Sequence, residues 1–324
     1  MNLRVRKDQT LGPPGAGGFF VVYGMPRTGT TYLYHALSKH PGIFVSYRKE
    51  SMFFTVNYDK GFGWYRSLFE EQTPDELGAD INPMYFMDDE SLDRLLSYAP
   101  DVKVILGVRH PVDFAISLYN NIVAHGHKPP DALSTLRGFD WPLTPEHGLP
   151  LCLDNRYLSR RIQELCERLG SNLLIYDFRY FGHSPLPVLK AIESFLDLPA
   201  YFDEENVETA KINASGRKNI LGFNRLVTNQ RLLETVYRIL PNGLIRRLRT
   251  GLERLSVARM DKAPESRPSL VSNEERRALE AYLEDDTAFY DRLFAGRPIL
   301  RGSDASAELS RSTANKAPSA QASA

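Results

Sequence analysis

The chain has 324 residues, 42% of them hydrophobic, and its formal net charge at pH 7 is zero. This length suits one large domain or two ordinary ones, with enough apolar residues for a sizeable core. A balanced charge excludes a partner attracted by bulk charge alone, whether nucleic acid or membrane. The two cysteines, Cys152 and Cys166, form neither a disulfide framework nor a zinc-binding pattern, so reduced thiols in a reducing compartment are expected.

The composition predicts three parts along the chain. Residues 1–18 lack an apolar signal region and are expected to form a flexible arm. Residues 19–300 are expected to form one α/β domain, and residues 301–324 a disordered tail rich in Ser and Ala. A run of about 18 apolar residues does not occur, so no transmembrane helix is expected.

Short apolar runs alternate with helical patterns along this domain, which predicts a parallel β-sheet flanked by helices. The Pro- and Gly-rich segment Lys128–Pro150 is expected to be a long loop. The expected strands are Phe19–Tyr23, Ile43–Ser46, Leu77–Ile81, Val102–Val108 and Leu173–Tyr176. The expected helices are Thr30–Lys39, Ser91–Tyr98, Val112–Ala124, Asp154–Leu169, Pro185–Leu196 and Asn273–Phe294.

The segment Gly24–Thr31 directly follows the first apolar run and has the spacing of a phosphate-binding loop that opens a helix. In loops that bind ATP or GTP, a lysine at the position of Thr30 reaches the β- and γ-phosphates. In this chain Thr30 stands in place of that lysine, so a main source of stabilisation for the charge of a transferring phosphate is absent. The backbone N–H groups of the loop can still hold an anion, and Arg27 adds a cation. We therefore expect a P-loop-like three-layer α/β sandwich that binds a phosphate but does not use ATP in the usual way.

Four segments resemble, in the same order, motifs of the sulfotransferases that use 3′-phosphoadenosine 5′-phosphosulfate (PAPS). Pro26–Thr31 resembles their 5′-phosphosulfate loop, and Arg48–Phe54 resembles the Lys-Glu-x-x-Phe-Phe segment of the branch that sulfates glycans. Val104–Ser117 carries an arginine after a buried strand and a serine eight residues later, as in the family's 3′-phosphate motif. Asn213–Arg217 resembles the late loop that closes over the 3′-phosphate. The resemblance extends over most of the predicted domain.

The resemblance implies a set of residues for the 5′ end of the donor. Arg27 and the backbone of Thr28, Gly29, Thr30 and Thr31 would hold the 5′-phosphosulfate. Arg27 would also act in catalysis by stabilising the transferring group. Because an arginine does not give up its proton, this help would be purely electrostatic.

A second set would bind the 3′-phosphate of the donor. Arg109 suits bidentate contact with phosphate, and Ser117 lies about two helical turns further on. Ser215, Gly216 and Arg217 would close over the same phosphate, with the glycine allowing close approach of the backbone. The alternative for Arg109 and Ser117 is an ordinary strand end followed by a serine on a helix face. The alternative for Ser215, Gly216 and Arg217 is a surface loop without a ligand.

Glu50 is the candidate general base, able to take the proton of an acceptor hydroxyl if burial makes its carboxylate more basic. The alternative is a surface carboxylate paired with Lys49 or Arg48. His125 and His127 are rival bases, because the branch that sulfates small molecules in the cytosol uses a histidine. These two histidines follow the 3′-phosphate helix, whereas the base of that branch precedes it.

The function that the resemblance implies is sulfuryl transfer from PAPS to a hydroxyl or amine of a carbohydrate or another small acceptor, by in-line displacement and without a metal. A nucleotide-dependent kinase or NTPase on the same fold and a non-catalytic nucleotide-binding module are the alternatives. Many glycan sulfotransferases have an N-terminal membrane anchor. Because this sequence lacks one, we expect a soluble cytoplasmic enzyme or a piece cut free of its anchor.

Two charged segments have no place in that reaction. The basic segment Arg246–Lys262 is expected to be a solvated helix face, with weak contact to an anionic surface or acceptor as the alternative. The acidic cluster Asp88–Glu90 suits a helix N-terminus better than a metal site. Neither segment indicates a nucleic-acid partner.

Overall fold

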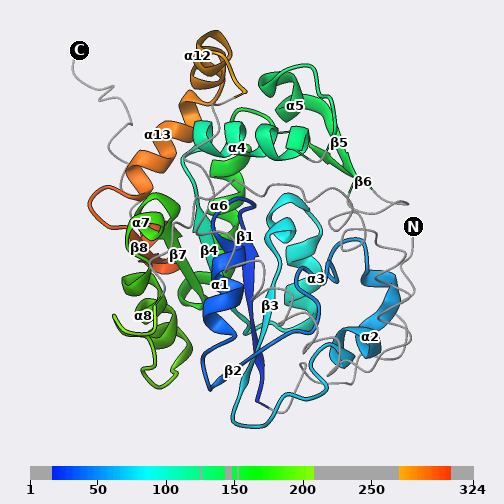
Figure 1. Ribbon diagram of the computed structural model, residues 1–324, viewed down its shortest axis with the longest axis vertical. Coiled ribbons are helices and arrows are strands. Elements are labelled where there is room, and N and C mark those ends of the chain that lie inside the picture. The colour runs from blue at the N-terminus through cyan, green and yellow to red at the C-terminus, as the bar shows by residue number, and fades with distance from the viewer. Residues whose placement is uncertain (1–16, 125, 143–147, 152, 208–269, 308–324) are drawn as a thin grey trace, which may run out of the picture.

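The computed structural model describes residues 17–124, 126–142, 148–151, 153–207 and 270–307. A six-stranded sheet forms its centre, in the order β2-β3-β1-β4-β7-β8 (Figure 1). The first five strands in this order are parallel, and β8 pairs antiparallel with β7. The strands are β1 Phe19–Gly24, β2 Ile43–Val45, β3 Leu77–Ile81, β4 Lys103–Val108, β7 Leu173–Asp177 and β8 Ile299–Arg301. The predicted parallel sheet is confirmed, and the antiparallel edge strand is an addition to it.

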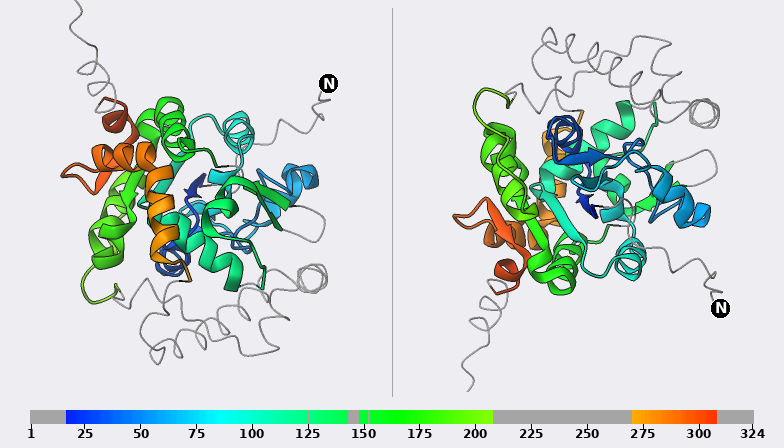
Figure 2. Two further views of the ribbon diagram at one scale, coloured as in Figure 1. Left: turned by 90° about the horizontal axis from the view of Figure 1, so that it is seen from above. Right: turned by 90° about the horizontal axis from the view of Figure 1, so that it is seen from below.

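Helices cover both faces of the sheet (Figures 1 and 2). The side chains of β1 alternate between two cores, with Val21 and Tyr23 in one and Phe20 and Val22 in the other. This alternation follows from the twofold period of a strand and makes both faces apolar. The first core includes residues of α3 Ser91–Tyr98, α4 Pro111–Ala124, α6 Tyr157–Leu169, α12 Asn273–Tyr282 and α13 Glu284–Leu293. The second includes residues of α1 Thr30–Leu37, α7 Phe178–His183 and α8 Pro185–Leu196. The predicted three-layer sandwich is confirmed.

The segment Lys128–Pro150 is more ordered than the expected long loop. It contains α5 Ala132–Gly138 and most of a hairpin formed by β5 Phe139–Pro142 and β6 Gly148–Leu151. Asp131 starts α5, because its side chain accepts a hydrogen bond from the backbone N–H of Ser134 at 2.8 Å. The prolines and glycines suggested a loop, but this capping residue was a local signal for a helix. The remaining short elements are η1 Tyr58–Lys60, α2 Gly61–Ser67, η2 Pro83–Met87 and η3 Gly170–Asn172.

The C-terminal region differs from prediction in two ways. The expected helix Asn273–Phe294 is divided at Leu283 into α12 and α13. After β8 the chain continues as a helix through residue 307, and Ala305 is only 1% exposed. The start of the tail at residue 301 was therefore predicted too early. Residues 1–16 and 308–324 lie outside the described part, so the arm and the rest of the tail stay predictions.

Candidate functional site

Three predicted donor-binding residues meet at the carboxyl ends of β1 and β4. These strands are neighbours in the sheet, so the segments that follow them emerge at the same edge. The Arg109 guanidinium donates a hydrogen bond from Nη1 to the backbone carbonyl of Arg27 at 3.0 Å. Arg27 in turn donates from Nε to Oγ of Ser117 at 3.1 Å. Two cationic side chains and a hydroxyl thus come together from segments up to 90 residues apart.

The loop between β1 and α1 is held by three hydrogen bonds, two of them to the sheet and one within the loop. The backbone N–H of Met25 donates to the carbonyl of Gly107 at 2.7 Å. Thr28 is fully buried, and its hydroxyl donates to the carbonyl of Met25 at 2.6 Å. The Tyr176 hydroxyl donates to the Thr28 carbonyl at 3.0 Å. The Thr28 side chain therefore holds the loop together and leaves ligand contact to the backbone.

Gly107 is required for this arrangement. A Cβ atom at this position would overlap the Tyr176 hydroxyl and approach Oγ1 of Thr28 within 2.9 Å. Both contacts belong to groups that hold the loop, so a side chain here would push the loop off the sheet. In the sequence, Gly107 stands out only as one position of the expected strand Val102–Val108.

The loop ends at the N-terminus of α1. Gly29 is the N-cap, with a left-handed φ of 78°, and its missing side chain leaves the first turn without a side-chain cap. Exposed N–H groups and the helix dipole favour an anion at such an end. Thr30 is buried while Thr31 is exposed, so the hydroxyl of Thr31 is the accessible one.

The two arginines are partly withdrawn from water. Burial lowers the pKa of Arg109 to about 10, with Asp113 opposing the shift and Arg27 adding to it. The Arg109 guanidinium also lies over the ring of Phe178, 5.0 Å from its centre. Burial lowers the pKa of Arg27 as well, and the nearby Glu50 carboxylate offsets part of this change. Two neighbouring, partly desolvated cations repel each other, and a bound anion would relieve that repulsion.

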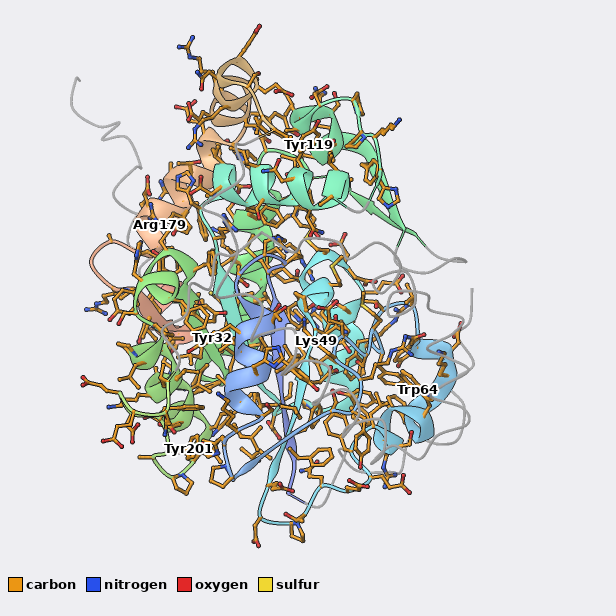
Figure 3. The ribbon with its side chains drawn as sticks, in the orientation of Figure 1. Tyr32, Lys49, Trp64, Tyr119, Arg179 and Tyr201 are labelled. Atoms are coloured by element: carbon orange, nitrogen blue, oxygen red, sulfur yellow. The ribbon has the colours of Figure 1, made fainter. Side chains whose placement is uncertain are left out.

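Glu50 lies beside this group, on the loop that follows β2. Its backbone N–H donates to the carbonyl of Ile81 at 3.2 Å, and its carboxylate lies 3.4 Å from the Lys49 ammonium. Lys49 also donates to the Thr31 hydroxyl at 2.7 Å. Figure 3 places Lys49 and Tyr32 on opposite sides of α1. The Glu50 side chain is 37% exposed, so it lacks the burial on which its role as a base was made conditional.

The other predicted site residues are His127, which the structure describes, and five residues or segments that it does not. His127 is half-buried and packs edge-on against Phe139, with ring centres 6.0 Å apart. His125, the loop of Ser215, Gly216 and Arg217, and the basic segment 246–262 lie outside the described residues. Their roles stay predictions.

A buried carboxylate below Glu50 was missed by sequence reasoning. Asp80 is completely buried in β3 and accepts hydrogen bonds from Ser51 at 3.1 Å, Tyr65 at 2.9 Å and Tyr85 at 2.8 Å. Burial raises the pKa of Asp80 to about 6, and the three hydrogen bonds limit the rise. Because Ser51 directly follows Glu50, this cluster fixes the loop that carries the candidate base. A charged residue within an apolar strand was the available signal.

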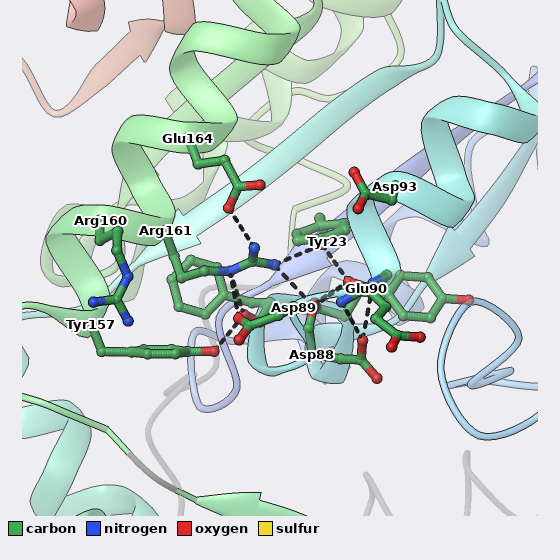
Figure 4. Close-up of polar contacts among 12 residues, drawn as sticks. Tyr23, Asp88, Asp89, Glu90, Asp93, Tyr157, Arg160, Arg161 and Glu164 are labelled. Carbon is green, nitrogen blue, oxygen red and sulfur yellow. Dashed lines mark hydrogen bonds and ion pairs between the residues drawn. The ribbon is translucent and has the colours of Figure 1, made fainter. Parts of the chain in front are cut away.

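The acidic cluster Asp88–Glu90 is part of a structural network around Arg161 (Figure 4). Asp88 accepts hydrogen bonds from the first backbone N–H groups of α3, as expected for a helix N-terminus. Arg161, whose side chain is 3% exposed, donates to the Tyr23 hydroxyl at 3.1 Å and pairs with Glu164. These contacts join α6 to β1 and to the start of α3. Within the ranges that the structure describes, no three potential metal ligands gather.

Sequence comparison finds relatives among known sulfotransferases. A membrane-associated sulfotransferase of Dictyostelium discoideum is 35% identical over 104 residues, which are 31% of this chain and 22% of that protein. Human heparan sulfate glucosamine 3-O-sulfotransferase 5 is 26% identical over 233 residues, covering 68% of this chain and 64% of the relative. The predicted resemblance to the glycan sulfotransferases is confirmed. The chain spans less than two thirds of either relative's length.

Among solved structures, a sulfotransferase from Alicyclobacillus acidocaldarius is similar over 60% of this chain and 89% of its own, with a TM-score of 0.47 and 19% identity. No protein-family profile matches the chain.

The expectation of a cytoplasmic enzyme is wrong. The relatives include a sulfotransferase named as membrane-associated and several heparan sulfate sulfotransferases. These relatives contradict the expected cytoplasmic location. The expectation depended on the number of cysteines and the absence of a long apolar run, and neither of these determines a compartment. Across the helices that the structure describes, none is long and apolar enough to span a bilayer.

Proposed function

We propose that this protein transfers a sulfuryl group from PAPS to a hydroxyl or amine of an acceptor. The observation that carries the proposal is the meeting of Arg27, Arg109 and Ser117 at the carboxyl edge of the sheet. Its relatives among the sulfotransferases support the same reaction. The Thr30 position, where an ATP-using loop has lysine, argues against phosphoryl transfer.

The 5′ end of the donor would lie against the loop and the first turn of α1. The backbone N–H groups of residues 28–31 would hold the phosphosulfate, together with the Arg27 guanidinium. Thr28 stays inside the loop, so its contribution comes from the main chain alone. Both cations carry their charge at neutral pH, which fits a donor with several negative charges.

The 3′-phosphate would bind Arg109 and Ser117. Because Oγ of Ser117 accepts the N–H of Arg27, its own O–H proton is free to be donated to a phosphate oxygen. The Arg109 guanidinium has five N–H donors and uses one on the Arg27 carbonyl, so others are available for paired hydrogen bonds to a phosphate. The loop of Ser215, Gly216 and Arg217 is proposed to close over this group.

In the proposed mechanism, Glu50 removes the proton from the acceptor as the acceptor oxygen or nitrogen attacks the sulfur in line with the leaving phosphate. Arg27 stabilises the negative charge that moves onto the phosphate oxygen. The exposed side chain of Glu50 suits this role, since an acceptor must reach it from solvent. No covalent enzyme intermediate and no metal are part of the proposal.

The proposed acceptor is a carbohydrate. The names of several relatives specify heparan sulfate, and the Arg48–Phe54 segment resembles that branch. The proposal for the acceptor is thus based on relatives, whereas the proposal for the donor also has the geometry of the site behind it.

Calorimetric titration with adenosine 3′,5′-bisphosphate (PAP), the spent donor, tests the proposal. Titrations with ADP and ATP, each with and without Mg²⁺, are the comparison. We expect PAP to bind tightly without metal and ADP, which lacks the 3′-phosphate, to bind much more weakly. A preference for ATP with Mg²⁺ would refute the proposal in favour of a kinase or NTPase. Tight PAP binding without turnover of PAPS on any acceptor would instead indicate a non-catalytic module.

A further inference from the structure

Lys49 occupies an unusual position for a cation that belongs to no recognised phosphate motif. It comes from the loop after β2, yet its ammonium group donates to the Thr31 hydroxyl in the first turn of α1. The N-terminus of a helix is positive, so a second positive charge there is unfavourable by itself. The side chain is only 17% exposed, so water screens this repulsion less than at an open surface.

The charges around Lys49 are not balanced within the described cluster. Glu50 faces Lys49 at 3.4 Å, and the same carboxylate also acts on Arg27. One carboxylate thus faces two cations and the positive end of α1. Such an excess of positive charge is what a site for a phosphate dianion requires.

Lys49 also contacts the residue next to the position at which ATP-using loops carry a lysine. The phosphate loops of ATP-using proteins carry a lysine at the position of Thr30, directly before the hydroxyl residue that corresponds to Thr31. Here Lys49 reaches that hydroxyl residue from a neighbouring loop. Lysine differs from Arg27 in being a compact, mobile cation on a flexible stem, able to follow charge as it moves.

We propose that Lys49 is a further catalytic residue, which stabilises the leaving 5′-phosphate in place of the missing loop lysine. This inference depends on the proposed sulfuryl transfer. In the step itself, the acceptor oxygen forms a bond to sulfur while the bond from sulfur to the bridging phosphate oxygen breaks. The electron pair of the broken bond stays on that oxygen, and the proton of the acceptor passes to Glu50.

The pairing of Lys49 with Glu50 connects the two halves of this step. Before transfer, the Glu50 carboxylate attracts the Lys49 ammonium and reduces its effect on the donor. When Glu50 takes the acceptor proton it becomes neutral, and the charge of Lys49 then acts fully on the phosphate oxygen. Stabilisation by Lys49 is therefore greatest as the leaving group becomes negative, which is the condition for accelerating the reaction.

Three variants of the full chain test this role: Lys49→Met, Lys49→Arg and Lys190→Met. Lys190 is an exposed lysine on α8 and is the matched control for loss of one positive charge. Conversion of PAPS to PAP is followed with N-desulfated heparan sulfate as acceptor and with water alone, which gives kcat and the KM for PAPS, and binding of PAP to the wild type is measured by calorimetry. We expect Lys49→Met to lower kcat about 100-fold, as for loss of one transition-state donor, with a KM for PAPS that changes at least tenfold less. Lys49→Arg should recover part of kcat, and Lys190→Met should match the wild type.

Other results would overturn the proposal in distinct ways. A Lys49→Met variant with wild-type kcat, whether or not its KM for PAPS rises, would show that Lys49 does not act in the transition state. A Lys49→Arg variant no more active than Lys49→Met would exclude a role for the charge. If the wild-type protein neither binds PAP nor converts PAPS with either acceptor, the proposed function itself fails. Active wild-type protein with an active Lys49→Met variant refutes only the role of Lys49.

Discussion

The buried carboxylate of Asp80 should make the stability of the protein depend on pH in a direction opposite to that of an ordinary salt-bridged carboxylate. Its ordinary pKa is 3.8, and burial raises the pKa to about 6 in the folded chain. Asp80 is 0% exposed, so solvent does not screen this effect. The folded state therefore holds the proton more tightly than the unfolded state does.

The size and sign of the effect follow from this difference. Below pH 3.8 the carboxyl is protonated in both states, and the contribution of Asp80 to stability is at its highest. As the pH rises toward 6 the unfolded state releases its proton first, so stability falls until Asp80 is ionised in both states. A gap of about 2 units corresponds to about 3 kcal/mol in the free energy of unfolding, at 1.36 kcal/mol per unit.

The assay is urea denaturation of the wild type and Asp80→Asn at several values between pH 4 and pH 7. Asparagine stays neutral throughout, so the difference between the two proteins isolates the titration of Asp80. We expect the stability of the wild type relative to Asp80→Asn to fall by about 2.4 kcal/mol over this range, since part of the full effect lies below pH 4. Asp75→Asn, at an exposed carboxylate, is the matched control for the substitution. A difference that stays level or increases with pH would refute the assignment of a desolvated carboxylate to Asp80.

Three further substitutions test the donor site. Arg109→Ala should weaken PAP binding about 10- to 100-fold in calorimetry, because it removes charge-assisted hydrogen bonds to phosphate, and an unchanged affinity would contradict its assignment. Glu50→Gln should bind PAP normally and lower kcat at least about 100-fold, and full turnover would exclude Glu50 as the base. Gly107→Ala should lower the free energy of unfolding by about 1–3 kcal/mol in urea denaturation and also weaken PAP binding, since the added carbon meets Tyr176 and Thr28. A stable variant with normal affinity for PAP would show that the loop tolerates the displacement.

Much of the fold could be predicted because its signals are local. The strand pattern of β1 and the glycine-bounded loop after it lie next to each other in the sequence, and both were identified. The meeting of Arg109 with Arg27 was also accessible, since parallel strands place their carboxyl ends at one edge. Strand β8 was missed because it has three residues, and its pairing with β7 depends on a partner more than 120 residues away. Such a short run has no periodicity of its own to detect.

The identity of the site residues could be predicted from the sequence, but their burial and their contacts could not. Glu50 was identified by its motif, yet its exposure depends on how the surrounding loop packs, which no local pattern reports. The Asp80 cluster needs hydroxyls from three separate segments, at Ser51, Tyr65 and Tyr85, to converge on one carboxylate. Contacts of this kind are set by the tertiary fold, so a sequence can show the buried charge without showing what surrounds it.

The hydrogen bond from Arg109 to the Arg27 carbonyl connects the two proposed phosphate sites. Arg27 has a left-handed φ of 67°, an unfavourable conformation for a residue with a side chain, so outside contacts must hold it. Arg109 provides one such contact at 3.0 Å, and the bond between Met25 and Gly107 fixes the loop from the side of β4. The residue proposed for the 3′-phosphate thus also shapes the loop proposed for the 5′-phosphosulfate. Loss of Arg109 should therefore weaken binding at both ends of the donor. Loss of Ser117 should also reach both ends, but through the Arg27 side chain, whose Nε–H its hydroxyl accepts, and not through the loop backbone.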